Sequence, residues 1–252
     1  MKRVNLLAIL LVLFIFLGMT SLGIAAVTWE FTHYETHINI DGYYNPTDAG
    51  FGSSDWMHSS TPIESHLEKD YETQHAAGSA SANFGALSVS GSANSGEEGS
   101  YIHNHAWGNF DGLFIAEYSS YKVSYHLESD LAAGRDEEWY DSWGSVGVHL
   151  GIRNETKQEW YYIGGINKDI QHGNESFIID WNYLFSPEIG DEISFWIELS
   201  QDEWANGFSW ANTSADLSFE VVEVAATPIP GTFLLLGFGI TALIGLSRRK
   251  RR

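Results

Sequence analysis

Apolar and polar residues alternate along much of this chain of 252 residues. In segment 193–199, apolar side chains such as Phe195 and Leu199 occupy the odd positions, whereas Ser194 and Glu198 occupy even positions. A period of two residues places alternate side chains on opposite faces of a β-strand. No segment of the body shows the long 3.6-residue apolar period of an amphipathic helix. The alternation therefore predicts a body made of half-buried strands.

Further strand candidates share a high content of β-branched and aromatic residues. They are residues 29–40, 87–92, 113–127, 146–153, 160–166, 177–185 and 217–221. Turn-type sequences separate them, for example the segment 186–191 with its Pro and Gly. Many short strands joined in this way indicate an all-β, antiparallel β-sandwich, and we favour a jelly-roll-like arrangement over a closed barrel. Segments 65–77 and 131–140 are expected to form short helical turns.

Two segments have compositions that differ from the strand candidates. Residues 41–61 are rich in Gly, Asn, Asp and Ser, which predicts a long surface loop. Residues 78–100 consist largely of Gly, Ala and Ser, which indicates either an edge hairpin with small side chains or a mobile insertion. Strand-like sequence resumes directly after both segments, so neither is expected to link two domains. We therefore expect one extracytoplasmic domain over residues 27–227.

Charge is distributed unevenly between the body and the two ends of the chain. There are 13 Lys and Arg against 33 Asp and Glu, and seven of the basic residues lie at positions 2–3 and 248–252. Residues 27–227 therefore carry 6 minus 33, a net charge of −27. Such a body repels phosphate backbones, which excludes sequence-independent nucleic-acid binding. The sequence has no cysteine, which excludes disulfides, thiolate metal sites and an acylated lipoprotein anchor.

Residues 1–26 have the three parts of a secretory signal peptide. Lys2 and Arg3 provide the positive start, residues 6–17 form an unbroken apolar run, and small residues lead to Ala25 and Ala26. We expect signal peptidase to cleave after one of these two alanines. The alternative is an uncleaved membrane anchor, although the apolar run is shorter than the ~20 residues that a spanning helix needs.

The other end of the chain also has three parts in succession. They are the motif Pro228, Ile229, Pro230 and Gly231, an apolar segment from Phe233 to Leu246, and a basic cluster of Arg248, Arg249, Lys250, Arg251 and Arg252. A basic cluster beside an apolar segment stays on the cytoplasmic side of the membrane. The body is therefore expected to face outward, and residues 228–252 are treated as a segment separate from it.

Together with the signal peptide, this layout resembles the PEP-CTERM sorting domain of Gram-negative bacteria. The resemblance is confined to residues 228–252 and implies processing by an exosortase, with the C-terminal helix anchored transiently in the inner membrane. It also implies a final location at the cell surface or outside the cell, often in association with exopolysaccharide and biofilm. Ile229 departs from the family motif, which has an acidic residue at this position. The alternative is an ordinary single-pass tail anchor.

The aromatic residues indicate a carbohydrate site. Exposed Trp and Tyr stack on the faces of sugar rings, while acidic or amide neighbours hydrogen-bond the hydroxyl groups. The candidate contacts in loop-like sequence are Trp56, Trp139, Tyr140, Trp143, Trp204 and Trp210. Trp29, Trp160, Trp181 and Trp196 lie in strand patterns, so we expect them to pack in the core.

Two acidic segments are candidates for binding Ca²⁺. The first group is Asp41, Asn45 and Asp48, and the second is Asp136, Glu138 and Asp141. Calcium prefers hard oxygen ligands in flexible loops, but neither spacing matches an EF-hand, and a solvated acidic surface is the alternative. His103 and His105 would share one face of a strand, as ligands of one metal ion must. The cupin pattern around them is incomplete, so we assign the pair to an exposed loop.

Three functional classes remain open. The first is a secreted surface or matrix protein with a structural or adhesive role, and the second is a carbohydrate-binding module, aided by Ca²⁺, that recognises exopolysaccharide. The third is a surface enzyme that acts on polysaccharide. None of the 33 carboxylates can be singled out as catalytic, and the sequence has no nucleophile elbow, phosphate-binding loop or His-Glu-x-x-His motif. We therefore expect a protein that is not an enzyme.

Overall fold

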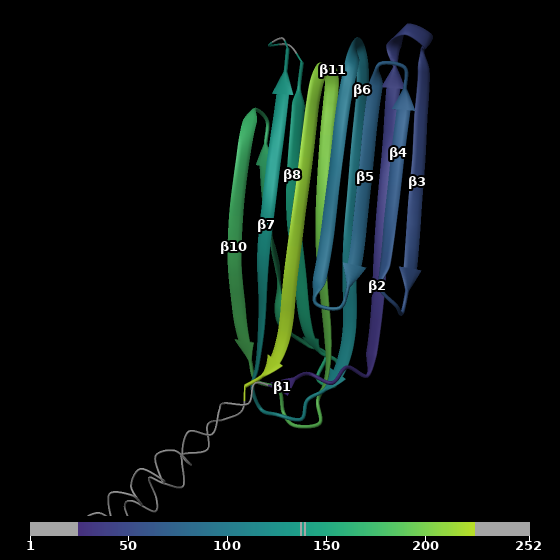
Figure 1. The fold of residues 1–252 in the computed structure, drawn as a ribbon. Helices are drawn as coiled ribbons and strands as arrows, with labels where there is room; N and C mark the ends of the chain where they lie inside the picture. Colours follow the sequence, from purple (N-terminus) through teal and green to yellow (C-terminus); the bar gives the residue numbers. More distant parts are fainter. Residues whose placement is uncertain (1–24, 137, 139, 225–252) are drawn as a thin grey trace, which may run out of the picture.

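The computed structural model describes residues 25–136, 138 and 140–224. These residues form two packed layers of long antiparallel strands, so the all-β sandwich predicted from the alternation is confirmed (Figure 1). The elements in chain order are β1 (Ala25–Ala26), β2 (Phe31–Tyr44), the 3-10 helix η1 (Asn45–Thr47), β3 (Ala49–Ser59), β4 (Ile63–Tyr71), β5 (Gln74–Asn83), β6 (Ala86–Ile115), β7 (Tyr121–Arg135), β8 (Ser142–Asn154), β9 (Glu159–Ile170), β10 (Gly173–Phe185) and β11 (Glu192–Glu223).

Strands β6 and β11 each belong to both layers. Residues 192–206 of β11 pair with 101–115 of β6, and residues 208–218 of β11 pair with 86–96 of β6. The two ladders meet at a register shift beside Gly207, whose φ of 64° lies in the left-handed region that favours glycine. The β6–β11 ribbon therefore bends over the upper end of the sandwich as drawn in Figure 1.

The bend defines the neighbours in each layer. One layer has the order β9-β8-β11-β6-β2-β3 and uses residues 192–206 of β11 and 101–115 of β6. The other has the order β10-β7-β11-β6-β5-β4 and uses residues 208–223 of β11 and 86–96 of β6. Because hydrogen bonding continues through the bend, the two layers form one folded sheet of 11 strands.

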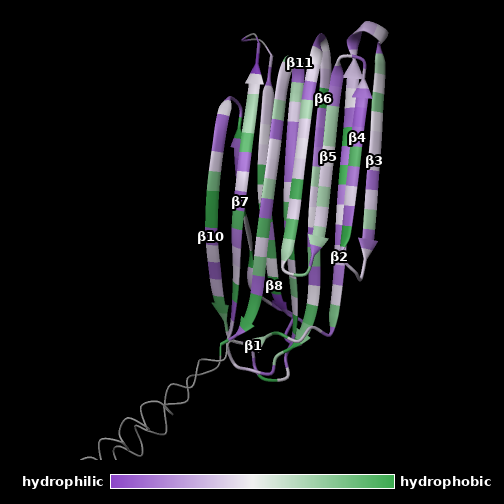
Figure 2. Ribbon diagram, in the orientation of Figure 1, coloured by the Kyte–Doolittle hydropathy of each residue, from purple (hydrophilic) through white to green (hydrophobic). Residues whose placement is uncertain are grey.

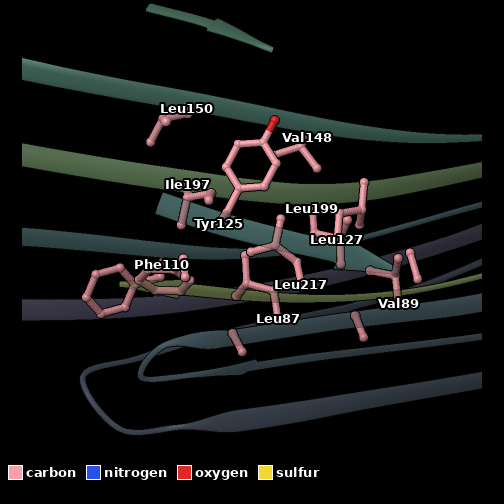
Figure 3. Close-up of a cluster of buried hydrophobic side chains, with 14 of the residues drawn as sticks. Leu87, Val89, Phe110, Tyr125, Leu127, Val148, Leu150, Ile197, Leu199 and Leu217 are labelled. Carbon is pink, nitrogen blue, oxygen red and sulfur yellow. The ribbon is translucent and has the colours of Figure 1, made fainter. Parts of the chain in front are cut away.

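The core lies between the layers and follows the predicted alternation. Figure 2 shows hydrophobic and hydrophilic residues alternating along the strands, and Figure 3 shows the resulting apolar cluster. Ile197 and Phe110 are fully buried, and Leu199, Leu87 and Leu217 approach them from both layers. Complete burial of one such side chain stabilises the fold by about 1.5–3 kcal/mol.

A polar cluster interrupts the apolar core at the level of the bend. Glu203 and Asn104 are fully buried, and Asn104 Nδ2 donates to Glu203 Oε2 at 2.7 Å. Thr213 donates a hydrogen bond to Glu203 from the opposite layer. Burial is the main cause that raises the pKa of Glu203 well above its usual value. This shift favours the neutral, protonated form of Glu203, which avoids an isolated charge in the core.

Several local predictions were wrong. Residues 41–61 form the end of β2, η1 and β3 in place of a long loop, because paired backbones tolerate Gly and Ser side chains that carry no strand signal. The predicted helical turns at 65–77 and 131–140 are strands in β4–β5 and β7, up to Arg135. The predicted strand 113–127 is interrupted at residues 116–120 between β6 and β7.

The small-residue segment 78–100 does form a hairpin, made of β5 and the first part of β6. That part of β6 is not an edge strand, because β11 pairs along its other side. Its small side chains face close neighbours, since a Cβ atom added at Gly91 would lie 2.5 Å from Glu203 Oε2 and 2.3 Å from Asn104 Nδ2. Small residues here reflect tight packing between the layers and do not mark a mobile insertion.

Both expected processing segments fall largely outside the described residues. Positions 1–24 of the signal peptide and all of 228–252 are not described. Ala25 and Ala26, where we expect signal cleavage, form β1 and pair with Glu223 and Val222 at the end of β11. Within the part of the chain that is described, no helix is long and apolar enough to cross a bilayer.

Candidate functional site

Tryptophans gather on the outer face of the layer that contains β2, β3, β8 and β9. We call this surface the aromatic face and define it by the outward side chains of β2, β3, β6 (101–115), β8, β9 and β11 (192–206). Its tryptophans are Trp56, Trp107, Trp143, Trp160, Trp196 and Trp204. Trp29 and Trp181 pack against the core, and Trp210 lies on the opposite outer face.

Strand parity explains why these side chains share one face. In β6, the even positions from Ile102 to Phe114 point inward, so the odd positions point outward. Between Tyr101 and Asp111, the outward residues of β6 are Tyr101, His103, His105, Trp107, Asn109 and Asp111. In β11 the parity is reversed, and the outward residues between Trp196 and Trp204 are Trp196, Glu198, Ser200, Asp202 and Trp204. The antiparallel register places these two sets side by side.

One row of rings crosses the aromatic face near the bend. Trp143 of β8 lies opposite Trp204 of β11 in the register. The ring of Trp204 stacks on Tyr101, with centroids 4.9 Å apart and planes 14° from parallel. Tyr101 in turn stacks on Tyr43 of β2 at 6.2 Å. The row therefore extends over β8, β11, β6 and β2.

A second ring cluster lies at the β3 edge of the same face. The His37 ring is 4.9 Å from Trp56 and 5.8 Å from Trp107, and the two indoles are 5.7 Å apart in a T-shaped arrangement. Trp56 is 57% exposed, so this cluster offers a large apolar surface to a ligand. Burial is the main cause that lowers the pKa of His37, which favours its neutral form.

The third aromatic position lies on the β8 side. Trp196 packs directly against the backbone of Gly151, since a Cβ atom added there would lie 2.0 Å from the indole Nε1. At the edge strand β9, Trp160 is 49% exposed, and the Arg153 guanidinium lies 5.5 Å from its ring centroid. Glycine at position 151 is therefore what allows Trp196 to lie close to the sheet.

Polar side chains fill the spaces between the rings. His103 Nε2 is 2.6 Å from Asp202 Oδ1, and His103 Nδ1 is 3.3 Å from Asp41 Oδ1. The hydrogen bond to Asp202 is the largest cause that raises the pKa of His103. His105 Nδ1 lies 3.8 Å from Asp202 Oδ2. These groups present both donors and acceptors beside the Trp204 ring.

Carboxylates are crowded in the middle of the aromatic face. Burial is the main cause that raises the pKa of Glu198; His149 and His105 oppose the shift, and the negative charges of Glu35 and Asp111 add to it. Burial also raises the pKa of Asp111, while hydrogen bonds from His33 at 3.3 Å and Asn109 at 3.0 Å oppose that shift. Three strands thus bring carboxylates together in a partly desolvated region.

The opposite outer face has a different chemistry. We call it the serine face, defined by the outward side chains of β4, β5, β6 (86–96), β7, β10 and β11 (208–223). Serine hydroxyls pair across β5 and β6, with Ser79 to Ser90 at 2.7 Å and Ser81 to Ser88 at 2.6 Å. Three hollows of about 390, 420 and 500 Å³ lie along this face. His126 lines two of them and contacts carboxylates, at 2.7 Å from Asp180 and 3.1 Å from Glu128.

The structure distributes the candidate carbohydrate contacts over three places. Trp56, Trp143 and Trp204 lie together on the aromatic face. Trp210 lies on the serine face over Gly134, and Tyr140 packs against Phe208 at the bend. Trp139 lies outside the described residues.

Some tryptophan assignments need correction. Trp160 and Trp196 do not pack in the core as expected, because both occupy outward positions in their strands. The expected core positions of Trp29 and Trp181 are confirmed, for example by the 5.3 Å contact between Trp29 and Phe114. Trp107 was not among the predicted carbohydrate contacts or the predicted core residues. The same alternation that identified the inward residues would have placed Trp107 and Trp196 outward.

The first candidate calcium group does not share a flexible loop. Asp41 is an outward residue of β2 that accepts a hydrogen bond from Asn39 at 3.1 Å. Asp48 accepts a hydrogen bond from Tyr43, and Asn45 donates one to the Glu98 carbonyl. Each of the three side chains therefore has its own separate partner.

The second candidate calcium group lies near the bend. Asp141 faces Arg135, with 3.7 Å between Oδ1 and the guanidinium, and the Asp136 backbone N–H donates to the Phe208 carbonyl. The prediction that His103 and His105 lie in an exposed loop was wrong, because both belong to β6. Among the described residues, three potential metal ligands converge within 4.8 Å at Glu68, Asp70 and His75, which the sequence did not indicate.

Comparison with known proteins gives distant structural likenesses. The sequence matches no protein-family model and no curated protein. A structure of CBM4 aligns with 63% of this chain and 78% of its own, at 10% identity and a TM-score of 0.25. TmCBM61 in complex with β-1,4-galactotriose covers 60% of this chain and 89% of its own, at 8% identity and a TM-score of 0.19. A structure of the infectious bursal disease virus Gx strain aligns with 80% of this chain and 62% of its own, at 11% identity and a TM-score of 0.23.

Several of the aligned structures are thus carbohydrate-binding modules, including the mannan-specific TmCBM27. All of these TM-scores lie below 0.5, so the likenesses assign no ligand to this chain. The functional proposal therefore rests on the residues of this protein's two outer faces.

Proposed function

We propose that this protein binds polysaccharide through its aromatic face. The observation that carries the proposal is the segregation of exposed and half-exposed tryptophans to that face, where six of the described tryptophans lie outward against one on the serine face. Sugar rings have apolar faces bounded by hydroxyl groups, so they suit a surface where indole rings alternate with hydrogen-bonding side chains. The aromatic face has both kinds of group.

The dimensions of the face favour a polymer over a single sugar. The ring row from Trp143 to Tyr43 crosses four strands, and neighbouring strands lie about 4.8 Å apart. Trp56 and Trp107 offer a second contact toward the β3 edge. A chain of several sugar units would therefore contact both ring clusters, and the Asp202–His103–Asp41 network would bond its hydroxyls. We propose binding without bond cleavage.

The two ends of the chain support a proposal about location. A signal peptide and a PEP-CTERM-like segment with a basic end would deliver the acidic body outside the inner membrane, by way of signal peptidase and an exosortase. We therefore propose a cell-surface or extracellular-matrix protein that attaches to exopolysaccharide in biofilm, which unites an adhesive role with carbohydrate recognition. Mass spectrometry of the surface form tests this proposal. A surface form that retains Arg252 would contradict the exosortase processing.

The binding proposal can be tested by tryptophan replacement. The polysaccharide secreted by the source organism is titrated into the purified body while intrinsic fluorescence and heat of binding are recorded. Trp204→Ala removes the centre of the ring row, and we expect it to weaken binding by about 2 kcal/mol, or roughly 30-fold. Trp210→Ala on the serine face is the matched control and should bind as tightly as the unaltered protein.

Two outcomes would contradict the binding proposal. One is a fluorescence signal and heat that do not change at any polysaccharide concentration. The other is an equal loss of affinity in Trp204→Ala and Trp210→Ala, because it would show that the aromatic face has no special role. Circular dichroism of both variants separates a loss of binding from a loss of folding.

A further inference from the structure

The three central strands of the aromatic face carry carboxylates but no fixed positive charge. Strands β2, β6 and β11 contain neither Lys nor Arg anywhere along their lengths. Their outward carboxylates on this face are Glu35, Asp41, Asp111, Glu192, Glu198 and Asp202. A polysaccharide that lies across the rings therefore meets a strongly negative surface.

The positively charged side chains on or beside this face do not neutralise its carboxylates. Arg153 of β8 is 3.5 Å from Glu155 and also bonds Gln158, so its charge is compensated at the end of the strand. His37 favours its neutral form because burial lowers its pKa. The charge of protonated His103 is shared between Asp41 and Asp202. His33 lies 3.3 Å from Asp111, and His105 lies 3.8 Å from Asp202. The six outward carboxylates of the central strands on this face therefore outnumber the four outward histidines.

The carboxylates also repel one another. Burial raises the pKa of Glu198, the nearby His149 and His105 oppose this shift, and the negative charges of Glu35 and Asp111 add to it. A bound cation would relieve this repulsion, whereas a bound anion would add to it. An ammonium group would in addition donate charge-assisted hydrogen bonds to the carboxylates, which are stronger than bonds from a hydroxyl. The face is thus complementary to a cationic ligand.

We propose that the aromatic face selects a polysaccharide that carries free amino groups, such as a polymer of de-N-acetylated amino sugars. This inference rests on the proposed carbohydrate binding and specifies its ligand class. The indole rings contact the sugar rings, and the carboxylates of Glu198, Asp202 and their neighbours bind the ammonium groups. Polymers of uronic acids are excluded by like-charge repulsion.

The test compares three sugar probes of equal length. A β-1,4-linked glucosamine hexamer, its fully N-acetylated counterpart and a hexamer of uronic acid are titrated calorimetrically at about pH 6.5 and low salt. We expect the glucosamine hexamer to bind at least ~10-fold more tightly than the acetylated one, and the uronate not to bind. Added salt should weaken the first complex and leave the second nearly unchanged.

Charge-removing variants locate the effect on the face. Glu198→Gln keeps the size of the side chain and should weaken glucosamine binding by ~5–10-fold, while binding of the acetylated hexamer stays within ~2-fold. Asp216→Asn on the serine face is the matched control. Equal weakening by the control would overturn the assignment, because it would show a dependence on overall charge alone.

The outcomes separate this inference from the function on which it rests. If the acetylated hexamer binds as tightly as the glucosamine hexamer, the amino-group selectivity is overturned while carbohydrate binding stands. If the uronate hexamer binds most tightly, the face prefers an anionic ligand and the proposed selectivity for amino groups is overturned. If none of the probes and no secreted polysaccharide binds, the proposed function itself fails.

Discussion

The aromatic face and the serine face come from the same two long strands but have different chemistries. Residues 101–111 of β6 place Tyr, His, Trp, Asn and Asp outward, whereas residues 86–96 of the same strand place mainly Ser and Asn outward. Strand β11 divides less sharply, because its outward residues beyond Gly207 include Phe208 and Trp210 as well as Asn212 and Ser214. The two halves of one strand therefore contribute to different surfaces, because the bend places each half in a different layer.

The shared core provides the strongest way to disturb both faces together. Phe110 is fully buried and its ring lies 5.4 Å from Trp29 and 5.0 Å from Phe219 of the other layer. Phe110→Ala should lower the free energy of unfolding by about 3–5 kcal/mol, because it leaves a cavity between the layers. Thermal unfolding followed by circular dichroism measures this loss. A loss of unfolding free energy below about 1 kcal/mol would show that the packing of the two layers does not depend on this contact.

The buried Glu203 gives a pH test of the same interface. Its folded pKa lies above the usual 4.5, so the folded protein holds a proton that the unfolded chain releases. Stability is therefore expected to fall as pH rises from about 4.5 toward the folded pKa, by up to ~1.4 kcal/mol per pH unit. Glu203→Gln keeps the shape without the charge and should flatten this dependence. Denaturant unfolding across the pH range measures it, and an unchanged slope in the variant would assign the dependence to other groups.

A matched pair of glycine substitutions sharpens the comparison between the faces. Gly151→Ala would push Trp196 away from β8, and Gly134→Ala would push Trp210 away from β7, since each added Cβ meets an indole ring. We expect the first to weaken polysaccharide binding by about 1 kcal/mol and the second to leave it unchanged. Calorimetric titration of both variants provides the measurement. Similar losses in the two variants would remove the functional distinction between the faces.

The smallest expected effect concerns one histidine on each face. Asp202 raises the pKa of His103, so this pair stabilises the fold at low pH and its contribution is lost as pH rises through the folded pKa of His103. His103→Gln should remove a stabilisation of less than about 1 kcal/mol near pH 6. His126→Gln on the serine face is the control, because that histidine is exposed and solvent screens its contacts. Denaturant unfolding of both variants near pH 6 measures the two effects, and an equal loss in His126→Gln would remove the difference between the two histidines.

Local sequence patterns predicted the strands well where one face is apolar. The alternation around Phe195 gave the correct inward residues, and it also contained the outward position of Trp196. Trp196 was nevertheless assigned to the core, because an aromatic residue in a strand resembles a core residue. Its even position, opposite in parity to the buried odd positions, was not taken into account. Segments 41–61 and 65–77 were misassigned because Gly, Ser and charged side chains on edge strands lack the apolar alternation.

The sequence alone determined that this protein is built of strands, that its body carries −27, and which parity of each strand is apolar. Only the tertiary structure decided which outward residues become neighbours. Asp202 lies opposite His105, and Trp204 lies opposite His103, although about a hundred residues of chain separate the members of each pair. Backbone pairing between antiparallel strands leaves no local sequence signal that identifies the partner strand. The aromatic face exists because β6 and β11 pair on both sides of Gly207 and bend together beside it.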